Sequence, residues 1–457
     1  MPFNANLLLR TLTDLQGVAT PRRYLVGFSG GLDSTVLVHA LKQAPGPVAP
    51  IVAVHINHAL QPDAGVWEEH CRSAAEALGV EFVARTVVVT EDEGVGLEAA
   101  AREVRYAAFK ELMQEGDVLL TAHHADDQAE TLLLNLMRGS GVAGLAGIGA
   151  SHPFGPGLLI RPMLNVSRQD IERYARECEL EWTDDPSNLD LRFDRNYLRA
   201  EILPRLRQRW PAVAARLGHS AGLAAEAARL QEELAWLDLC GLAETGETDA
   251  AAPDRLSVIG LTKLSSARQR NVLRCAIKAS GLPQAPAKRL REIQVQMLTA
   301  REDAAPLVRW PGAEVRRYRT KLYLLRAPHP QQLPDTATLP LLYGDGREVQ
   351  LGPLGALCLE RTAHTVAEPG IDPALVTDGL ALRFRNGGEK IKPYGHKETR
   401  PLKKLLQEQA VVPWMRPNLP LLYAGDTLVA VADLWIAADS ARDDGFKVRW
   451  IGKPPLF

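Results

Sequence analysis

Residues 24–35, with the sequence YLVGFSGGLDST, constrain the fold of this chain more than any other stretch. They begin as a short apolar run typical of a buried strand, break at the Ser-Gly-Gly of residues 29–31, and resume as a helix-like pattern over residues 33–41. Glycines let the backbone approach an anion, and the free N–H groups and dipole of a helix start favour negative charge. A strand, a glycine loop and a helix start therefore predict a phosphate-binding site.

Two common phosphate loops do not match this stretch. A Walker A loop requires Gly-Lys-Ser or Gly-Lys-Thr, and no lysine lies between Arg23 and Lys42. A dinucleotide-binding turn requires Gly-x-Gly-x-x-Gly directly after a strand, which Ser-Gly-Gly does not supply. Residues 29–34 instead resemble the PP-loop of the ATP pyrophosphatase superfamily; the alternative is an ordinary tight turn. The resemblance implies ATP as a substrate, bound through Ser29, Gly30, Gly31, Leu32, Asp33 and Ser34.

Composition bounds the class of protein. A length of 457 residues allows about three domains, and a net charge of −2 gives no global basic field for nucleic acid. Five scattered cysteines without a Cys-x-x-Cys pair argue against a disulfide framework or a zinc site and favour a reducing compartment. Because neither a signal peptide nor an apolar run of about 18 residues is evident, the sequence predicts a cytoplasmic protein without a membrane span.

Apolar runs alternate with helix-like segments in the first part of the chain. The runs cover residues 24–28, 51–58, 82–89 and 118–122. This alternation predicts an α/β fold with a parallel sheet covered on both faces. Ligands in such sheets bind beyond the carboxyl ends of the strands, so His58 and the PP-loop are expected to line one crevice. A lone histidine is also common as a surface or core residue, and the sequence leaves both readings of His58 open.

A second chemical cluster, HHADDQAET, occupies residues 123–131 and precedes a helix predicted over residues 132–138. Asp127 and Glu130 are three residues apart, so one helical turn places both carboxylates on one face. They could cap the helix dipole, bind magnesium, or hold a substrate ammonium group. A zinc site is disfavoured because no further histidine or cysteine lies at ligand spacing nearby.

Local basic segments stand out in a nearly neutral chain. Residues 192–209 contain six arginines and only two acidic residues, and residues 383–404 contain eight Lys or Arg and only two Glu. A strong helix pattern over residues 96–109 brings Arg102 and Arg105 within one turn of each other. These segments are either solvated faces or contacts for RNA phosphates. A further basic stretch is predicted to be exposed on short strands over residues 309–325, through Arg316, Arg317, Arg319 and Lys321.

Several motifs occur in a fixed order and together resemble the tRNA(Ile)-lysidine synthetase family. They are the PP-loop, His-x-x-x-Asp-x-x-Glu-Thr at residues 123–131, Arg-Gly-Ser-Gly at 138–141, Arg-Pro-Met-Leu at 161–164, Asp-x-Ser-Asn at 185–188 and Arg-Asn-x-x-Arg at 195–199. The resemblance is dense from residue 24 to about residue 210 and resumes near the C-terminus. One motif alone is only suggestive, whereas the ordered set is specific.

The resemblance implies a ligase that joins free L-lysine to C2 of the wobble cytidine in the CAU anticodon of tRNA(Ile). The reaction passes through an adenylated tRNA, releases AMP and pyrophosphate, and changes the codon read from AUG to AUA. The implied catalytic residues are Asp33, Asp127, Glu130 and Arg195. Asp33 would hold Mg²⁺, and lysine would be bound by Asp127, Glu130, Arg195 and Arg199. Contacts with tRNA are expected from Arg102, Arg105, Arg385, Lys390, Lys403 and Lys404.

The sequence divides into four segments. They are a PP-loop catalytic domain at residues 1–215, a mainly helical tRNA-binding domain at 216–326, a linker at 327–335 and a small α+β tRNA-binding domain at 336–457. Other PP-loop enzymes, such as a tRNA thiolase or a glutamine-using synthetase, are disfavoured because no cysteine stands in the setting they use. A non-catalytic RNA-binding protein is disfavoured by the intact acidic residues. A homodimer stays open.

Overall fold

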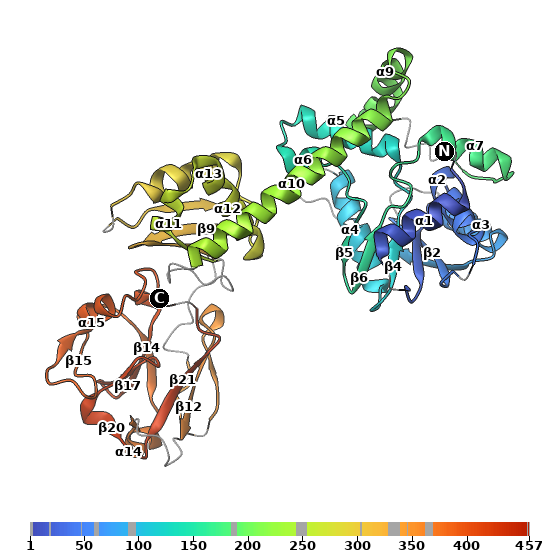
Figure 1. Ribbon diagram of the computed structural model, residues 1–457. Coiled ribbons are helices and arrows are strands. Elements are labelled where there is room, and N and C mark those ends of the chain that lie inside the picture. The colour runs from blue at the N-terminus through green and yellow to red at the C-terminus, as the bar shows by residue number, and fades with distance from the viewer. Residues whose placement is uncertain are drawn as a thin grey trace. The chain divides into compact units, whose positions relative to one another are not determined.

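The computed structural model describes most of the chain (Figure 1). The described residues are 3–17, 20–46, 48–58, 64–89, 97–183, 190–243, 254–301, 304–327, 339–344, 346–361, 369–454 and 456. They form two compact units, Met1–Glu233 and Leu234–Phe457. Residues 328–335 of the predicted linker and the Asp-x-Ser-Asn motif at 185–188 lie outside the described residues.

A six-stranded sheet forms the centre of the first unit, with the strand order β3-β2-β1-β4-β6-β5. Neighbouring strands run parallel, except that β5 is antiparallel to β6. The strands are β1 (Tyr24–Gly27), β2 (Ile51–Asn57), β3 (Glu81–Thr86), β4 (Val118–Leu120), β5 (Ser151–Phe154) and β6 (Gly157–Ile160). The predicted α/β class with a parallel sheet is confirmed.

Helices cover both faces of this sheet, because alternate residues of a strand point to opposite sides. Tyr24 and Val26 of β1 pack with residues of α1, α2, α3 and α7, whereas Leu25 between them packs with α4. The helices of this unit are α1 (Ala5–Gln16), α2 (Leu32–Lys42), α3 (Ala64–Ala77), α4 (Leu97–Leu112), α5 (Ala125–Met137), α6 (Val142–Leu145), α7 (Arg168–Glu177), α8 (Asp194–Tyr197), η2 (Leu198–Ile202) and α9 (Leu203–Arg209). The long helix α10 (Val213–Ala243) crosses the boundary between the units.

Helix α5 differs most from its sequence prediction, since it begins at Ala125 rather than at residue 132. His124 caps it: the imidazole Nδ1 accepts from the N–H of Asp126 at 3.2 Å, and the carboxylate of Asp127 accepts from the N–H of His124 at 2.9 Å. Histidine is rarely counted among capping residues, so the sequence pattern did not place the helix start here. Both carboxylates of the predicted cluster therefore lie within the first two turns.

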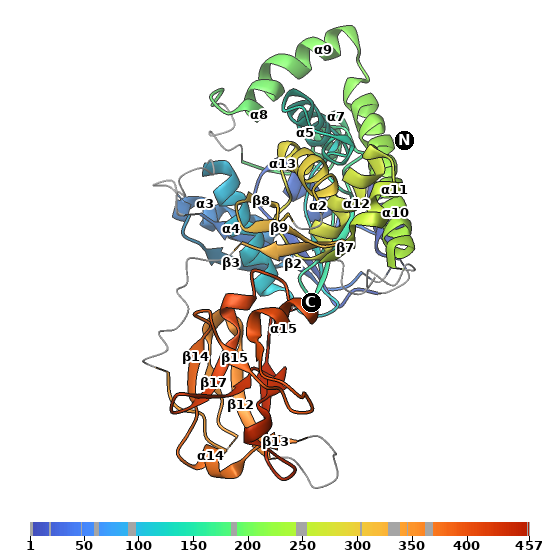
Figure 2. The ribbon, with the colours of Figure 1, turned by 90° about the vertical axis from the view of Figure 1, so that its left-hand side faces the viewer.

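The second unit joins a helical part to a strand-rich part, which Figure 2 shows with its strands β12, β14 and β17 labelled. The first part contains β7 (Arg255–Ser257), α11 (Val258–Lys263), α12 (Ser266–Ala279), α13 (Ala287–Glu292), η3 (Ile293–Met297), β8 (Leu307–Trp310), β9 (Ala313–Tyr318) and β10 (Lys321–Arg326). The second part contains β11 (Val349–Gln350), η4 (Gly352–Leu354), β12 (Ala356–Arg361), β13 (Gly370–Ile371), α14 (Pro373–Thr377), β14 (Ala381–Phe384), β15 (Lys390–Ile391), β16 (Arg400–Pro401), α15 (Leu402–Glu408), η5 (Arg416–Asn418), β17 (Pro420–Ala424), β18 (Thr427–Val431), β19 (Trp435–Ile436), η6 (Ala438–Ser440), β20 (Ala441–Arg442) and β21 (Phe446–Ile451).

The predicted exposure of the basic stretch on β9 is wrong for Arg317, which is only 6% exposed. Its Nε donates to the carbonyl of Arg319 at 3.0 Å, and its Nη1 donates to the carbonyl of Met297. The side chain lies on the inner side of the strand, where alternation along the strand buries it. Within the described ranges, no helix has both the length and the apolar character needed to cross a membrane.

The start of β6 admits only glycine. A Cβ atom on Gly157 would lie 2.0 Å from the backbone carbonyl oxygen of Asp117, which cannot move without breaking the sheet. We expect Gly157→Ala to destabilise the first unit by at least about 1–3 kcal/mol and to lower its thermal midpoint. Gly218→Ala in α10 is the matched control, because a Cβ there meets nothing within 4 Å. Equal midpoints for the two variants would contradict this prediction.

Candidate functional site

The PP-loop joins β1 to α2 at the carboxyl edge of the sheet. Gly30 has a φ of 71°, in the left-handed region that favours glycine, and a Cβ atom there would lie 2.9 Å from the Sγ of Cys71. The Ser34 hydroxyl donates to the carbonyl of Gly31 at 3.1 Å and accepts from the N–H of Ser29 at 3.2 Å. These contacts hold the loop in a form whose backbone a phosphate can approach.

Two segments far away in the sequence brace the loop. The indole N–H of Trp67 on α3 donates to the carbonyl of Ser29 at 2.8 Å. The N–H of Thr183 donates to the carbonyl of Gly30 at 3.1 Å, and its hydroxyl lies 2.7 Å from Nε2 of His70. Neither contact is predicted from the sequence, because no local pattern marks a residue that binds a distant loop.

Asp33 occupies the first turn of α2 with an unusual division of its two oxygens. Its Oδ2 lies 3.4 Å from Nη1 of Arg168 and 3.6 Å from Nε2 of His124. Its Oδ1 is buried and has no hydrogen-bond partner. A free carboxylate oxygen beside a phosphate loop fits Mg²⁺, which takes few protein carboxylates and fills its shell with phosphate oxygens and water. Among the described residues, no group of three or more His, Cys, Asp or Glu side chains is arranged to hold a metal ion.

Four charged side chains form a closed cluster at the start of α5. Arg195 donates from Nε to Glu130 at 2.8 Å and from Nη2 to Asp127 at 3.1 Å. Arg199 donates from Nε to Glu130 at 2.7 Å and from Nη2 to Asp127 at 3.1 Å. The structure thus brings together all four residues that the sequence predicts for lysine, but as ion pairs with one another.

Burial makes the charges of this cluster strongly interdependent. Glu130 has no exposed surface, and Asp127 is 8% exposed. Burial raises the pKa of Asp127, but the charges of His124 and Arg195 outweigh it and lower the pKa to about 2. Burial lowers the pKa of His124, but the charges of Asp127 and Asp33 reverse this and leave it raised. His124 therefore links the PP-loop carboxylate to the α5 carboxylates.

The imidazole of His123 is kept neutral at the same edge of the sheet. Burial lowers its pKa to about 3, and the charges of Arg161, Arg195 and Arg102 act in the same direction, against Asp127. Its Nδ1 lies 2.9 Å from the hydroxyl of Thr121. A neutral ring here can accept or donate one hydrogen bond without adding charge to the site.

The two arginines of the cluster come from a helical segment that changes its winding. Arg195 lies in α8, and Arg199 lies in the π-helical turn η2 that follows it. Further along, Arg207 of α9 pairs with Asp126, whose other oxygen accepts from the N–H of Arg168 at 3.0 Å. The pairing of Asp126, Arg168 and Arg207 was missed by the sequence analysis, because it joins residues 42 and 81 positions apart.

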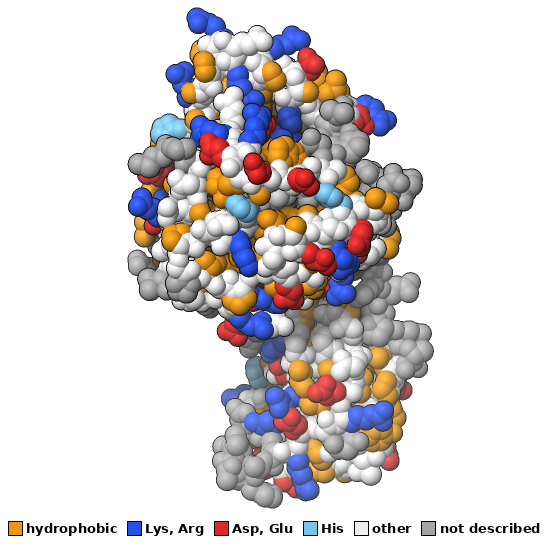
Figure 3. All heavy atoms as spheres, turned by 90° about the vertical axis from the view of Figure 1, so that its right-hand side faces the viewer, with side chains coloured by type: hydrophobic (Ala, Val, Ile, Leu, Met, Phe, Trp, Pro, Cys, Tyr) orange, Lys and Arg blue, Asp and Glu red, His pale blue; other side chains and the backbone are white. Residues whose placement is uncertain are grey.

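The outer side of the same segment is basic and partly aromatic. Figure 3 shows Lys and Arg side chains gathered at the height of α9 on one face of the molecule. The exposed side chains include the predicted patch members Arg192, Arg205 and Arg209, together with Phe193, Tyr197 and Trp210. Guanidinium groups next to aromatic rings are typical of surfaces that bind single-stranded RNA.

The remaining predicted residues of the first unit are His58, at the carboxyl end of β2, and Arg102 and Arg105 of α4. His58 directly follows β2, and its Nδ1 is buried without a partner. Burial and the charge of Arg105 lower the pKa of His58. On α4, the guanidinium of Arg102 lies 5.1 Å and that of Arg105 lies 5.9 Å from the ring centre of Tyr106. An unpartnered imidazole nitrogen at a strand end is consistent with a ligand contact.

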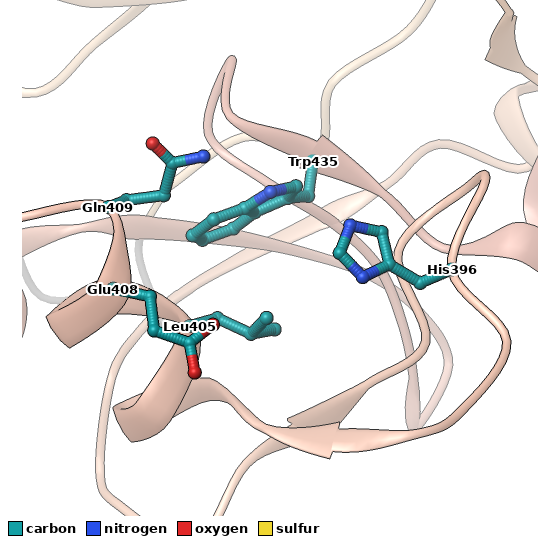
Figure 4. Close-up of a pocket in the computed structure, with 5 residues that line it drawn as sticks. All are labelled: His396, Leu405, Glu408, Gln409 and Trp435. Atoms are coloured by element: carbon teal, nitrogen blue, oxygen red, sulfur yellow. The ribbon is translucent and has the colours of Figure 1, made fainter.

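The predicted basic residues of the C-terminal part differ in their surroundings. Arg385 is largely buried and its Nε donates to Glu389 at 3.2 Å, whereas Lys390, Lys403 and Lys404 are exposed. A cavity of about 200 Å³ lies beside α15, the helix that carries two of these lysines (Figure 4). Its lining residues are His396, Leu405, Glu408, Gln409 and Trp435.

The low pKa of Asp127 predicts a dependence of stability on acid. Its folded value of about 2 lies below the unfolded value of about 3.9, so its stabilising effect is complete above pH 4 and is lost as the pH falls towards 2. We expect Asp127→Asn to reduce the drop in thermal midpoint between pH 5 and pH 3. Asp14→Asn, at an exposed position of α1, should keep the wild-type drop. An unchanged drop in Asp127→Asn would contradict the prediction.

Three family profiles match the chain. They describe a PP-loop domain at residues 5–206, a TilS substrate binding domain at residues 256–323 and a TilS substrate C-terminal domain at residues 380–450. Curated relatives named tRNA(Ile)-lysidine synthase align over nearly the whole chain. The Coxiella burnetii protein is 40% identical over 94% of this chain and 92% of its own length, and the Alkalilimnicola ehrlichii protein is 42% identical over 93% and 92%.

The relative from Salmonella schwarzengrund, also named tRNA(Ile)-lysidine synthase, is 38% identical over 97% of this chain and all of its own length. Such identity along both chains is far more than a shared domain would give. The three profiles match successive parts of the chain, at residues 5–206, 256–323 and 380–450. The resemblance found in the motifs is confirmed: this chain belongs to the tRNA(Ile)-lysidine synthase family.

Proposed function

We propose that this chain ligates free L-lysine to C2 of the wobble cytidine in the CAU anticodon of tRNA(Ile), in an ATP-dependent reaction that forms lysidine. The product would read AUA instead of AUG. One observation supports this most directly: the PP-loop carboxylate of Asp33 and the α5 carboxylates are joined through His124 at one edge of the sheet. This arrangement supports the proposal that phosphate chemistry and ammonium binding take place within reach of one substrate base.

In the first step, O2 of the cytidine attacks the α-phosphorus of ATP, and the bond to pyrophosphate breaks. Negative charge builds on the leaving pyrophosphate, and backbone N–H groups of the PP-loop are proposed to offset it. The free Oδ1 of Asp33 would hold Mg²⁺, which neutralises charge on the phosphates when bound. His58 is proposed to contact the nucleotide through its unpartnered Nδ1.

In the second step, the ε-amine of lysine attacks C2, and AMP leaves. Asp127 and Glu130 are proposed to bind lysine, yet both carboxylates are already neutralised by Arg195 and Arg199. A lysine ammonium can bind there only by displacing a guanidinium. The displaced arginine is then free to bind an anion that arrives in the same step, either the lysine carboxylate or the AMP phosphate.

This exchange keeps the charge of the site balanced throughout. Glu130 is fully buried, so leaving it without a cation would be strongly destabilising. The arginines act as counter-ions until lysine arrives. Lysine and the adenylated tRNA are therefore expected to replace internal ion pairs rather than to enter an empty cavity.

The tRNA is proposed to contact both units. Arg102 and Arg105 of α4 and the lysines Lys390, Lys403 and Lys404 are the candidate contacts, whereas Arg385 is held by Glu389 and is a weaker candidate. We also propose the domain division at residues 1–215, 216–326 and 336–457. Since tRNA is the substrate and all five cysteines are free thiols, the cytoplasm is the proposed compartment.

A tRNA thiolase is the nearest alternative activity. Sulfur transfer in that class relies on cysteine pairs, and here the five cysteines are at positions 71, 178, 240, 275 and 358. Cys71, next to the PP-loop, is buried, and burial raises the pKa of its thiol to about 12. A thiol that stays protonated at neutral pH is a poor nucleophile, so the site favours the ligase.

The direct test is incorporation of radiolabelled lysine into a CAU-anticodon tRNA(Ile) with ATP and magnesium. We expect ATP-dependent labelling, and Asp33→Ala should reduce it by at least about 100-fold, because charge on the leaving group is no longer offset. Asp14→Ala in α1 is the matched control with full activity. Wild-type turnover in a folded Asp33→Ala variant would overturn the role of Asp33. If folded wild-type protein shows no labelling and no tRNA-stimulated release of pyrophosphate, the proposed function is overturned.

The basic C-terminal surface gives a second test. Lys403→Glu with Lys404→Glu should weaken tRNA binding and reduce the slope of log affinity against log salt by about 1 to 2, as expected when phosphate contacts are lost. Filter binding at several salt concentrations measures both quantities. Lys453→Glu serves as the control, because the ammonium of Lys453 is already held by Asp433 at 2.6 Å. An unchanged slope in the double variant would move the tRNA site elsewhere.

A further inference from the structure

Arg161 is a buried cation that the proposed function does not use. The residue opens the Arg-Pro-Met-Leu motif directly after β6 and is only 4% exposed. Its guanidinium makes two hydrogen bonds, from Nη1 to the carbonyl of Gly149 at 2.6 Å and from Nη2 to the hydroxyl of Tyr106 at 3.4 Å. Both acceptors are uncharged. The Nε is buried and has no partner, and no carboxylate among the described residues forms an ion pair with Arg161.

In Arg23, which is half-buried, and in Arg317, which is buried, the Nε makes a hydrogen bond, unlike the Nε of Arg161. Arg23, at the opposite edge of the same sheet, donates from Nε and Nη2 to the buried carboxylate of Asp117. Arg317 also lacks a carboxylate, but its Nε donates to a backbone carbonyl. Burying a charge without a counter-ion is strongly unfavourable, so the partnerless Nε of Arg161 is a candidate contact for an anionic ligand.

Arg161 lies at the ligand-binding edge of the sheet. Strands β4 and β6 pair in parallel with Leu120 beside Ile160, and the N–H of Thr121 donates to the carbonyl of Ile160 at 3.1 Å. Arg161 and Thr121 are therefore the first residues beyond two adjacent strand ends. From Thr121 the chain runs directly into His123 and the α5 cluster. Ligands of open α/β sheets bind at this edge.

The surroundings of Arg161 carry an excess of positive charge. The neutral imidazole of His123 is subject to the fields of Arg161, Arg195 and Arg102 together. The carboxylates of Asp127 and Glu130 at the start of α5 are already shared between Arg195 and Arg199. Neither of them pairs with Arg161, so an anion is missing from this side of the site.

We propose that Arg161 forms a subsite for an oxyanion of the substrates, separate from the PP-loop and from the α5 carboxylates. The proposal rests on the proposed function for the identity of that oxyanion. Two substrate groups have the required chemistry: the α-carboxylate of lysine and a phosphate of the reacting nucleotide. Arg161 would hold either one by charge-assisted hydrogen bonds from its guanidinium.

Three full-length variants test this subsite. Arg161→Met removes the charge, Arg161→Lys keeps it without the planar fork, and Arg23→Met is the comparison variant, which removes a half-buried arginine that is ion-paired with Asp117. We expect Arg161→Met to lower kcat/KM by roughly tenfold or more, with partial recovery in Arg161→Lys. Its thermal midpoint should equal or exceed that of wild type, because an uncompensated buried charge is removed. Arg23→Met should lower the midpoint, because it removes the hydrogen-bonded ion pair between Arg23 and the buried carboxylate of Asp117.

The source of the oxyanion follows from a comparison of L-lysine with 1,5-diaminopentane, which lacks the carboxylate. If Arg161 holds the lysine carboxylate, wild type prefers lysine and Arg161→Met loses that preference without losing activity on the diamine. If Arg161 holds a nucleotide phosphate, Arg161→Met incorporates both amines more slowly and by the same factor. Its tRNA-dependent release of pyrophosphate is then also reduced when no amine is present. Either result supports the subsite.

Two results would overturn it. One is wild-type kinetics in Arg161→Met for both steps and both amines. The other is a fall in thermal midpoint like that of Arg23→Met, which would make Arg161 a structural residue. If wild type incorporates no lysine, the proposed function fails, and the subsite is then tested with AMP and with sulfate as probes. These anions should raise the thermal midpoint of wild type but not of Arg161→Met, and equal shifts would reject the subsite.

Discussion

The charge of Glu130 has no access to water, and the arrangement of the first unit depends on neutralising it. Two guanidinium groups from a segment more than 60 residues away hold this carboxylate, and they share Asp127 with the capping residue His124. His124 in turn reaches Asp33 in the PP-loop. Removing one partner of a buried ion pair leaves the other uncompensated, so a substitution at any of these positions is expected to destabilise the whole cluster. The same constraint fixes the helix α5 against the segment that follows residue 190.

Much of the fold follows from local patterns in the sequence, but the links within the site do not. The buried strands are apolar runs, and the PP-loop is recognisable from Ser-Gly-Gly between a strand and a helix. The pairing of Arg168 with Asp33 joins residues 135 positions apart, and Arg207 with Asp126 joins residues 81 apart. Such pairs depend on how helices pack, which no local spacing encodes. The early start of α5 was missed for a related reason, since its cap is a histidine stabilised by distant charges.

The structure also changes the meaning of the predicted lysine-binding residues. Carboxylates and arginines that the sequence assigns to opposite ends of one substrate bind each other in its absence. In this arrangement the charges of Asp127 and Glu130 are compensated within the protein, which favours both stability and selectivity. A small cation without an accompanying anion would gain little, because the displaced guanidinium would lose its partner.

The π-helical turn η2 limits how the chain can vary in length. It stands between Arg195 and the α9 residue Arg207, and both must meet carboxylates on one neighbouring helix. Each residue added to or removed from a helix rotates everything beyond it by about 100°. Rewinding η2 as a regular α-helix would therefore turn Arg207 away from Asp126 while Arg195 stayed in place. The number of residues between Arg195 and Arg207 is therefore fixed by the two ion pairs that these arginines make with α5.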